Sequence, residues 1–302
     1  MGHIGRHHRG VMTGPVIHER RSADVAARML AAWASRYLAR RAHQHLQDGL
    51  PQLALFAFEH VGRAVTVWGR YERDELDLLI QALTARQLLR SDGLCLDIGA
   101  NIGNHALFFA PHFAEVLAFE PNPRTFALLQ VNATLMPNVR CFNIGLSDAQ
   151  GAAQLAVPAD NIGMATLQRG ASGDAVACRL QRLDDLPELA GRRVALMKID
   201  VEGHESAVLR GARALLLRDR PVVVFEQAAA DIHDGTSPSM ALLREAGYAQ
   251  WWTLQGPPEG RLRLLNLARR LLRGDVHRFV ACQQLDKRFH SMVVALPGTG
   301  PG

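Results

Sequence analysis

Several features that mark particular protein classes are absent from this 302-residue sequence. No run of about 18 apolar residues occurs, so we expect no transmembrane helix. The four cysteines lie far apart and form no CxxC pair, which argues against a zinc cage or a disulfide scaffold and favours the cytosol. Residues 1–14 are rich in His, Arg and Gly and lack the apolar stretch of a secretory signal.

Lysine is also scarce, because only Lys198 and Lys287 are lysines among the 34 basic residues. The net charge of +5 is concentrated at the two ends. Residues 1–70 carry ten Arg against four acids and residues 251–302 carry eight basic against three acidic residues, which leaves 71–250 at −6. Nucleic-acid enzymes usually carry a basic stripe near the active cleft. The acidic centre therefore predicts no nucleic-acid partner.

The pattern of residues 21–92 predicts an N-terminal extension of helices and a short hairpin, after an unstructured segment 1–20. Apolar residues recur at three- and four-residue steps in the first part, as in an amphipathic helix. Two short apolar runs then flank Gly62, which suits a turn between paired strands. The predicted elements are helices at 22–45 and 72–89 and strands at 53–58 and 64–68.

From residue 94 apolar strand-like runs alternate with helical segments. Strands joined by helical crossovers form a mostly parallel sheet with helices on both faces. We therefore predict an α/β fold with a doubly wound seven-stranded sheet over 93–302, interrupted by an insertion at 255–290. Two short runs, 152–157 and 176–183, are expected outside this sheet. The predicted strands are 94–98, 116–120, 139–147, 195–200, 221–226, 248–254 and 291–296, with helices from 122 and at 205–217 and 237–246.

The strongest local signal is DIGANIGN, residues 97–104, between the first strand and its helix. Glycines at 99 and 103 would let the backbone approach a ligand closely and leave helix N–H groups free. The spacing is not the GxGxxG of dinucleotide sites, and Asp97 would repel a pyrophosphate. A cationic ligand with an amino-acid group would instead be favoured by this carboxylate.

Acidic residues also end the next two strands. Glu120 follows the second strand, where a carboxylate can accept hydrogen bonds from two ribose hydroxyls. Ser147 and Asp148 end the third strand, where an acceptor could meet an adenine amino group, although Asp148 is equally a common turn residue. Together these residues predict a nucleoside ligand without a pyrophosphate.

The segment KIDVEGHE, residues 198–205, and Glu226 place further acids at the ends of the fourth and fifth strands. Clustered carboxylates are costly unless they are solvated, paired or bound to metal. Asp200, His204 and Glu226 are the candidate general bases. An Asp/Glu pair here could also hold a divalent cation, although we predict no metal. Alternatively, Glu202 and Glu205 only favour the N-terminus of the following helix.

These motifs together resemble the FkbM-type S-adenosylmethionine-dependent methyltransferases, a branch of the class I methyltransferase fold. The resemblance runs from about residue 69 to 297 and does not clearly cover residues 1–70 and 255–290. It is carried by DIGANIGNHALFF (97–109), AFEPNP (118–123), NIGLSD (143–148), GMATL (163–167), RLDDL (182–186), KIDVEGHESAVLRGA (198–212) and VVVFE (222–226).

The resemblance implies S-adenosylmethionine as cofactor and an added antiparallel strand, which fits 291–296. It implies that Asp97, Gly99 and Gly103 cradle the methionine part, that Glu120 holds the ribose, and that Asp148 holds the adenine. The predicted cofactor-binding set is Asp97, Gly99, Asn101, Gly103, Asn104, Glu120, Ser147 and Asp148. His204 occupies the variable position of the family's DVEGxE pattern, so Asp200 is the preferred base.

The implied reaction is attack by a hydroxyl oxygen on the cofactor methyl group, with a sugar, a glycan, a glycolipid or another hydroxylated product as acceptor. An oxidoreductase and a non-catalytic scaffold that retains the fold are the alternatives. Residues 261–273 predict a basic amphipathic helix, which could contact the inner face of a membrane or cap the sheet or the substrate cleft. The acceptor's identity and the oligomeric state stay open.

Overall fold

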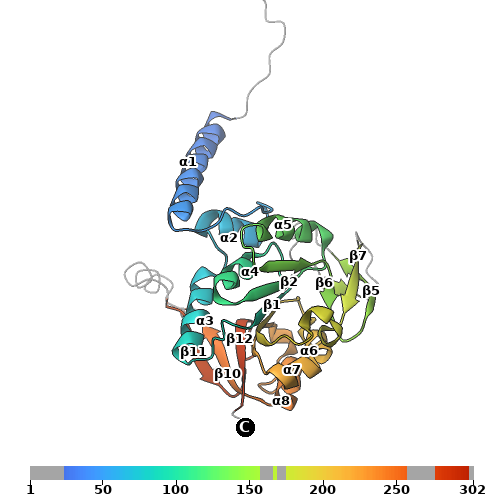
Figure 1. Cartoon of the computed structure of the whole chain (residues 1–302). Coiled ribbons are helices and arrows are strands. Elements are labelled where there is room, and N and C mark those ends of the chain that lie inside the picture. Colours follow the sequence, from blue (N-terminus) through green and yellow to red (C-terminus); the bar gives the residue numbers. More distant parts are fainter. Residues whose placement is uncertain (1–23, 157–165, 169–174, 257–275, 299–302) are drawn as a thin grey trace, which may run out of the picture.

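The computed structural model describes residues 24–156, 166–168, 175–256 and 276–298 (Figure 1). The predictions for 1–20 and 261–273 lie outside these residues. The helices are α1 (Val25–Gln47), α2 (His60–Trp68), α3 (Arg73–Ala85), α4 (Asn104–Phe109), α5 (Pro123–Ala133), α6 (Glu205–Gly211), α7 (Arg213–Asp219) and α8 (Pro238–Glu245). The strands are β1 (Leu94–Ile98), β2 (Glu115–Phe119), β3 (Val139–Phe142), β4 (Gly145–Leu146), β5 (Gly151–Ala156), β6 (Thr166–Gln168), β7 (Ala175–Gln181), β8 (Val194–Ile199), β9 (Val222–Gln227), β10 (Tyr248–Gln255), β11 (Arg278–Cys282) and β12 (His290–Pro297).

The larger sheet has the strand order β11-β10-β12-β9-β8-β1-β2-β3. β1 pairs in parallel with β2 and β8, and β3 and β9 extend the parallel part on either side. β12, β10 and β11 then pair antiparallel beyond β9. The order of the strands reverses between β1 and β8, and ligands of such sheets bind at the carboxyl ends of the strands near that point.

The predicted α/β sheet is confirmed, and the seven predicted strands all contribute to it. The antiparallel strand expected near 291–296 is β12. β11 is an eighth strand that the prediction missed, because it lies inside the segment 255–290 that we treated as an insertion. Its register against β10 pairs Trp252 with Ala281, so this part of the insertion completes the edge of the sheet.

Helices cover both faces of the sheet (Figure 1). On one face α6, α7 and α8 bury Val208, Leu215 and Met240 in a cluster with strand residues such as Ile98 and Phe225. On the other face α3, α4 and α5 bury apolar side chains against the opposite sides of the same strands. Burial of about 25 cal/mol per Å² of apolar surface on both faces holds the strand ends in fixed positions. The sheet is therefore a rigid support for the loops at its edge.

The hairpin predicted at 53–68 is wrong. Residues 60–68 form α2, and residues 53–56 belong to no helix or strand. The Ala54 N–H donates to Asn132 Oδ1 at 2.7 Å, and Asn132 Nδ2 donates to the Ala54 carbonyl at 2.9 Å. Gly69 ends α2 in a left-handed conformation, a common helix-ending signal that the prediction overlooked. Packing overrode the strand preference of valine and threonine in this segment.

Two other predicted elements are divided in the structure. The single strand expected at 139–147 is β3 and β4, because Asn143 between them donates to the carbonyls of Glu120 and Pro121 and turns the chain into a second sheet. That sheet has the order β4-β7-β5-β6 and contains the runs expected outside the main sheet. The helix expected at 205–217 is α6 and α7, since Asp184 accepts hydrogen bonds from the first N–H groups of α7.

Candidate active site

A cavity of about 400 Å³ lies at the carboxyl ends of β1, β2, β8 and β9, where the strand order reverses. Four of its lining side chains are carboxylates: Glu120 follows β2, Asp200 and Glu202 follow β8, and Glu226 lies in β9. The loops after β1 and β8 also supply lining backbone. Among the residues that line it are Gly99, Asn101, Glu120, Asp200, Glu202, His204 and Glu226. All three predicted general bases are therefore in one cavity with three of the predicted cofactor-binding residues.

Gly99 brings the loops after β1 and β8 together. It has a φ of +80°, and a Cβ at this position would overlap the Asp200 carbonyl oxygen. Two neighbouring non-glycine residues, Asn101 and Glu202, also have positive φ, of +50° and +51°. Backbone of this kind costs of order 1–3 kcal/mol per residue and persists where the surroundings enforce it. Two of the six described non-glycine residues with positive φ thus lie in the loops that line the cavity.

Glu120 is buried at the end of β2 and is oriented by two backbone N–H groups. Asn122 N–H donates to Oε1 at 2.8 Å and Asn101 N–H donates to Oε2 at 3.0 Å. Burial raises the pKa of Glu120 to about 7, although both N–H groups act in the opposite direction. Each carboxylate oxygen can accept a further hydrogen bond. The arrangement can therefore bind a pair of hydroxyls from the cavity side.

Asp97 lies beneath the cavity and does not line it. Its side chain is fully buried, and neither oxygen has a hydrogen-bond partner among the described residues. Lys198 Nζ lies 3.7 Å from Asp97 Oδ1 and 3.0 Å from Asp200 Oδ2. Burial disfavours the charged lysine, but the two carboxylates outweigh it and raise the pKa of Lys198. One ammonium thus compensates two acids, Asp97 within β1 and Asp200 directly after β8.

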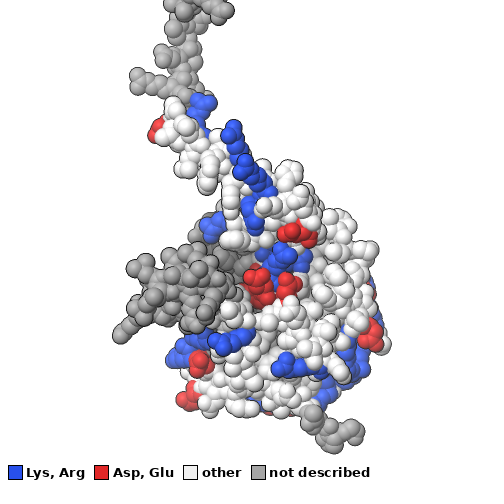
Figure 2. Space-filling view, turned by 90° about the vertical axis from the view of Figure 1, so that its left-hand side faces the viewer, with Lys and Arg blue, Asp and Glu red and all other residues white. Residues whose placement is uncertain are grey.

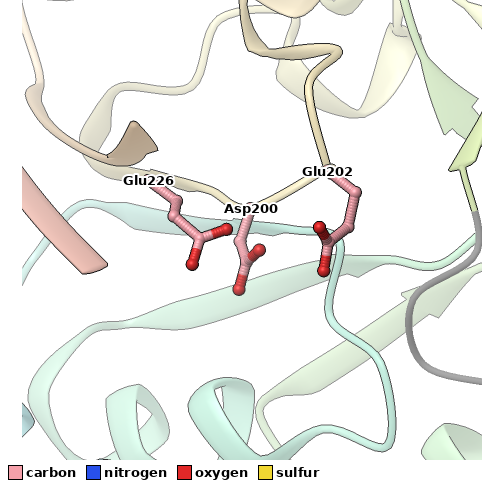
Figure 3. A group of neighbouring side chains, drawn as sticks. All are labelled: Asp200, Glu202 and Glu226. Atoms are coloured by element: carbon pink, nitrogen blue, oxygen red, sulfur yellow. The ribbon is translucent and has the colours of Figure 1, made fainter. Parts of the chain in front are cut away.

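Asp200, Glu202 and Glu226 converge on one side of the cavity (Figure 3). One oxygen from each lies within 4.8 Å of the others. Burial raises the pKa of Glu226, and the charge of Asp200 raises it further. Burial also acts to raise the pKa of Asp200, but Lys198 outweighs this effect and lowers it. Asp200 is therefore the ionised and Glu226 the protonated member of the pair at neutral pH.

The same three carboxylates are the group of described residues that could hold a metal ion. Hard divalent cations take oxygen ligands of this kind. Lys198 already places a positive charge 3.0 Å from Asp200. Acidic side chains occur together without an ion in many proteins, so the prediction that no metal binds stays a prediction.

His204 and Ser147 form a second polar pair at the cavity. His204 precedes α6 and lines the cavity, and its Nε2 lies 2.9 Å from Ser147 Oγ. Asp148 is directed elsewhere, because it accepts a hydrogen bond from Arg210 Nε at 2.8 Å on the surface, which lowers its pKa. Ser147 thus reaches the cavity region through His204, whereas Asp148 does not line the cavity.

Gly103 and Asn104 have structural contacts instead of a place in the cavity lining. Gly103 precedes α4 with a φ of +89°. Asn104 Oδ1 accepts from the Tyr71 N–H at 3.1 Å, and Asn104 Nδ2 donates to the Tyr71 carbonyl at 3.0 Å. This double hydrogen bond attaches the N-terminal extension to the loop after β1 and presents the Tyr71 ring to the cavity.

Sequence reasoning missed the contribution of the N-terminal extension and of Lys198. His60 and Tyr71 line the cavity, and their rings meet edge to face at 5.4 Å. No local pattern identifies them, since their partners are distant in the sequence. Lys198 did carry a signal, because it is one of two lysines in an arginine-rich chain and lies in a buried strand. A compact ammonium fits between two carboxylates where a planar guanidinium would not.

Comparisons with known proteins indicate the family to which this chain belongs. The Methyltransferase FkbM domain model matches residues 97–249. The hexuronic acid methyltransferase AglP of Haloferax volcanii is 32% identical over 182 residues, which cover 59% of this chain and 70% of AglP. The 2-O-methyltransferase NoeI of Sinorhizobium fredii is 27% identical over 176 residues, 52% of this chain and 72% of NoeI.

Among solved structures, a methyltransferase FkbM from Methylobacillus flagellatus KT is similar with a TM-score of 0.37 and 17% identity, over 69% of this chain and 45% of that chain. The assignment to a family rests on the domain model, which matches half of the sequence, and on the curated relatives. This chain belongs to the FkbM methyltransferase family.

Proposed function

We propose that the protein transfers a methyl group from S-adenosylmethionine to a hydroxyl of a sugar or glycan. The observation that carries the proposal is the division of the cavity: Glu120 lies at one strand end and the Asp200–Glu226 pair at another. One part can hold a nucleoside, and the other can accept the proton of a hydroxyl. The family assignment argues against the oxidoreductase alternative.

The residues near Glu120 fit a nucleoside cofactor. Its two oxygens are fixed by backbone N–H groups and can each accept from a ribose hydroxyl. Asn101 Oδ1 is buried without a hydrogen-bond partner among the described residues, so it is an acceptor in need of a donor. Apolar lining by Ile144, Leu146 and Leu155 suits the faces of an adenine ring. The bound cofactor would supply an electrophilic methyl group on a sulfonium.

Asp200 is the proposed general base. It is ionised beside Lys198, and it lies at the cavity wall with Glu226 next to it. A positioned base of this kind contributes typically about 10²–10⁴ in rate. His204 is the alternative base, although its contact with Ser147 gives it a positioning role.

The acceptor class follows from two observations. The named relatives are a hexuronic acid methyltransferase and a 2-O-methyltransferase, so sugars are the proposed acceptors. The charged side chains that line this cavity are four carboxylates, with only histidines as possible cations. A uronate carboxylate would find no Lys or Arg partner among these lining residues, and the ionised Asp200 would repel it. We therefore infer that a neutral sugar is a better acceptor here than a uronic acid.

A location in a reducing compartment such as the cytoplasm is part of the proposal, since all four cysteines are free thiols in the structure. None of the helices in the described ranges is long and apolar enough to cross a membrane.

The test combines calorimetry with a transfer assay. S-adenosylhomocysteine should bind the full chain, and NAD should not. Methyl-labelled cofactor should then label neutral glycans more than uronic acids, read by mass spectrometry. Binding of NAD alone would refute the cofactor assignment. Binding of S-adenosylhomocysteine without transfer to any hydroxylated acceptor would favour the scaffold alternative, and preferential labelling of uronic acids would refute the charge argument.

A further inference from the structure

The helix α1 projects from the body of the protein with large apolar side chains in solvent (Figure 1). Val25, Met29 and Trp33 are 66, 69 and 65% exposed, and Leu30 and Tyr37 are exposed as well. A globular protein rarely leaves so many large apolar side chains uncovered on one element. This face is therefore suited to contact something other than water.

Five of the exposed apolar residues form a stripe along the first half of the helix, and Arg36 and Arg40 lie beside it, three residues after Trp33 and Tyr37. Val25, Met29, Trp33 and Tyr37 recur every four residues, with Leu30 beside them, and the Trp33 and Tyr37 rings stack at 5.9 Å. The contacts that hold α1 to the body are at its other end. Arg41 Nε donates to the Val67 carbonyl of α2 at 3.0 Å, and His45 is buried. The hydrogen bond that joins α1 to α2 and the buried residue of α1 therefore lie in its C-terminal half.

The charge of α1 indicates which partner suits this face. The helix carries Arg28, Arg36, Arg40 and Arg41 and no acidic residue. Figure 2 shows basic side chains along one side of the projecting helix. In the sequence before it, residues 1–23 add four arginines and one glutamate. Pairing two copies of such a helix would bring like charges together, whereas an anionic lipid surface would be complementary.

We propose that α1 docks the protein on an anionic lipid bilayer, with its Trp33 face among the acyl chains and its arginines at the headgroups. Helices that combine apolar and aromatic side chains with arginines can lie in the interface plane, because long arginine side chains extend past apolar neighbours to the headgroups. α1 carries such side chains and no acidic residue and, like the other described helices, does not qualify as a membrane span. Aromatic rings such as those of Trp33 and Tyr37 favour the level of the headgroups.

Docking would also set the position of the cavity. α1 is joined to α2, whose residues His60 and Val61 line the cavity, and Trp68 at the end of α2 is 62% exposed. The cavity would therefore be held near the lipid surface. If the proposed function holds, this geometry favours a lipid-linked glycan as acceptor.

The test is co-sedimentation of the full chain with vesicles, without methyl donor or acceptor, so that it does not depend on methyl transfer. The wild type should bind vesicles of phosphatidylcholine and phosphatidylserine in equal parts and bind pure phosphatidylcholine at least about tenfold more weakly. A Met29→Gln/Trp33→Gln variant should lose about tenfold or more in binding to the mixed vesicles. An Arg36→Gln/Arg40→Gln variant should bind the mixed vesicles roughly thirtyfold more weakly, because each arginine contributes a factor of about five to the binding constant.

Leu217→Gln is the matched control, because Leu217 is 49% exposed on α7, away from α1, and its replacement should leave binding unchanged. All variants should keep the wild-type thermal transition and bind S-adenosylhomocysteine as the wild type does. The proposal is overturned if the wild type ignores the mixed vesicles or if the α1 variants bind like the wild type. It is equally overturned if sedimentation reveals a wild-type dimer that the Met29/Trp33 variant dissociates, since the face would then belong to a second copy.

Discussion

Replacing Glu120 by glutamine removes one carboxyl group whose folded environment disfavours its charge. Burial raises the pKa of Glu120 to about 7, from an ordinary value of 4.5. Between these values the folded protein binds more protons at this site than the unfolded chain does. The site therefore lowers the free energy of unfolding as the pH rises, and the loss is complete above the folded pKa.

The magnitude follows from the two pKa values. At about 1.36 kcal/mol per pKa unit, the wild type should lose roughly 2.5 kcal/mol through this group between about pH 5 and about pH 8. The Glu120→Gln variant lacks this loss. Its amide can accept from only one of the N–H groups of Asn101 and Asn122, which costs it about 1–3 kcal/mol at every pH. We therefore expect the free energy of unfolding of the variant, relative to that of the wild type, to rise by roughly 2.5 kcal/mol between about pH 5 and about pH 8. Urea unfolding at each pH measures this difference.

The same substitution tests the proposed role in binding. Each lost hydrogen bond from a hydroxyl to the charged carboxylate is worth about 1.5–3 kcal/mol, so S-adenosylhomocysteine should bind about 10²-fold more weakly by calorimetry. Asp185→Asn is the control, because it removes an exposed carboxylate and should change neither quantity. A pH-independent stability difference would refute the burial argument. Unchanged affinity would refute the assignment of Glu120 to the ribose.

Three further substitutions probe the loops and the charge network around this site. Gly99→Ala should lower the free energy of unfolding by about 2–4 kcal/mol in a urea titration, because a Cβ at positive φ would overlap the Asp200 carbonyl; wild-type stability would contradict the observed backbone. Lys198→Met leaves Asp97 and Asp200 without their cation, so the free energy of unfolding, measured by thermal unfolding, should fall by about 3–5 kcal/mol. A decrease below about 1 kcal/mol would argue against the ion pairs. Asp200→Asn should reduce kcat by about 10²–10⁴ while S-adenosylhomocysteine affinity stays within a few-fold, and an unchanged kcat would transfer the proposed base role elsewhere.

The sequence predicted which residues lie at the strand ends, but it did not predict which of their side chains face the cavity. Gly99, Glu120, Asp200 and Glu226 were predictable as neighbours, because each follows or ends a buried strand and parallel strands end at one edge of a sheet. For Gly103, Asn104 and Asp148, the same reasoning placed the residues near that edge but not the direction of their side chains. Their contacts with other elements decide that direction.

The sequence by itself determined which segments are buried strands and which glycines and acids follow them, since periodicity and turn residues are local properties. Only the tertiary structure decided that residues 60–68 are a helix, because packing on α1 and the bond between Ala54 and Asn132 replace a strand partner. It alone placed Lys198 between two acids and separated the pKa values of Asp200 and Glu226. These properties depend on burial and on distances between residues far apart in the chain, which no local pattern records.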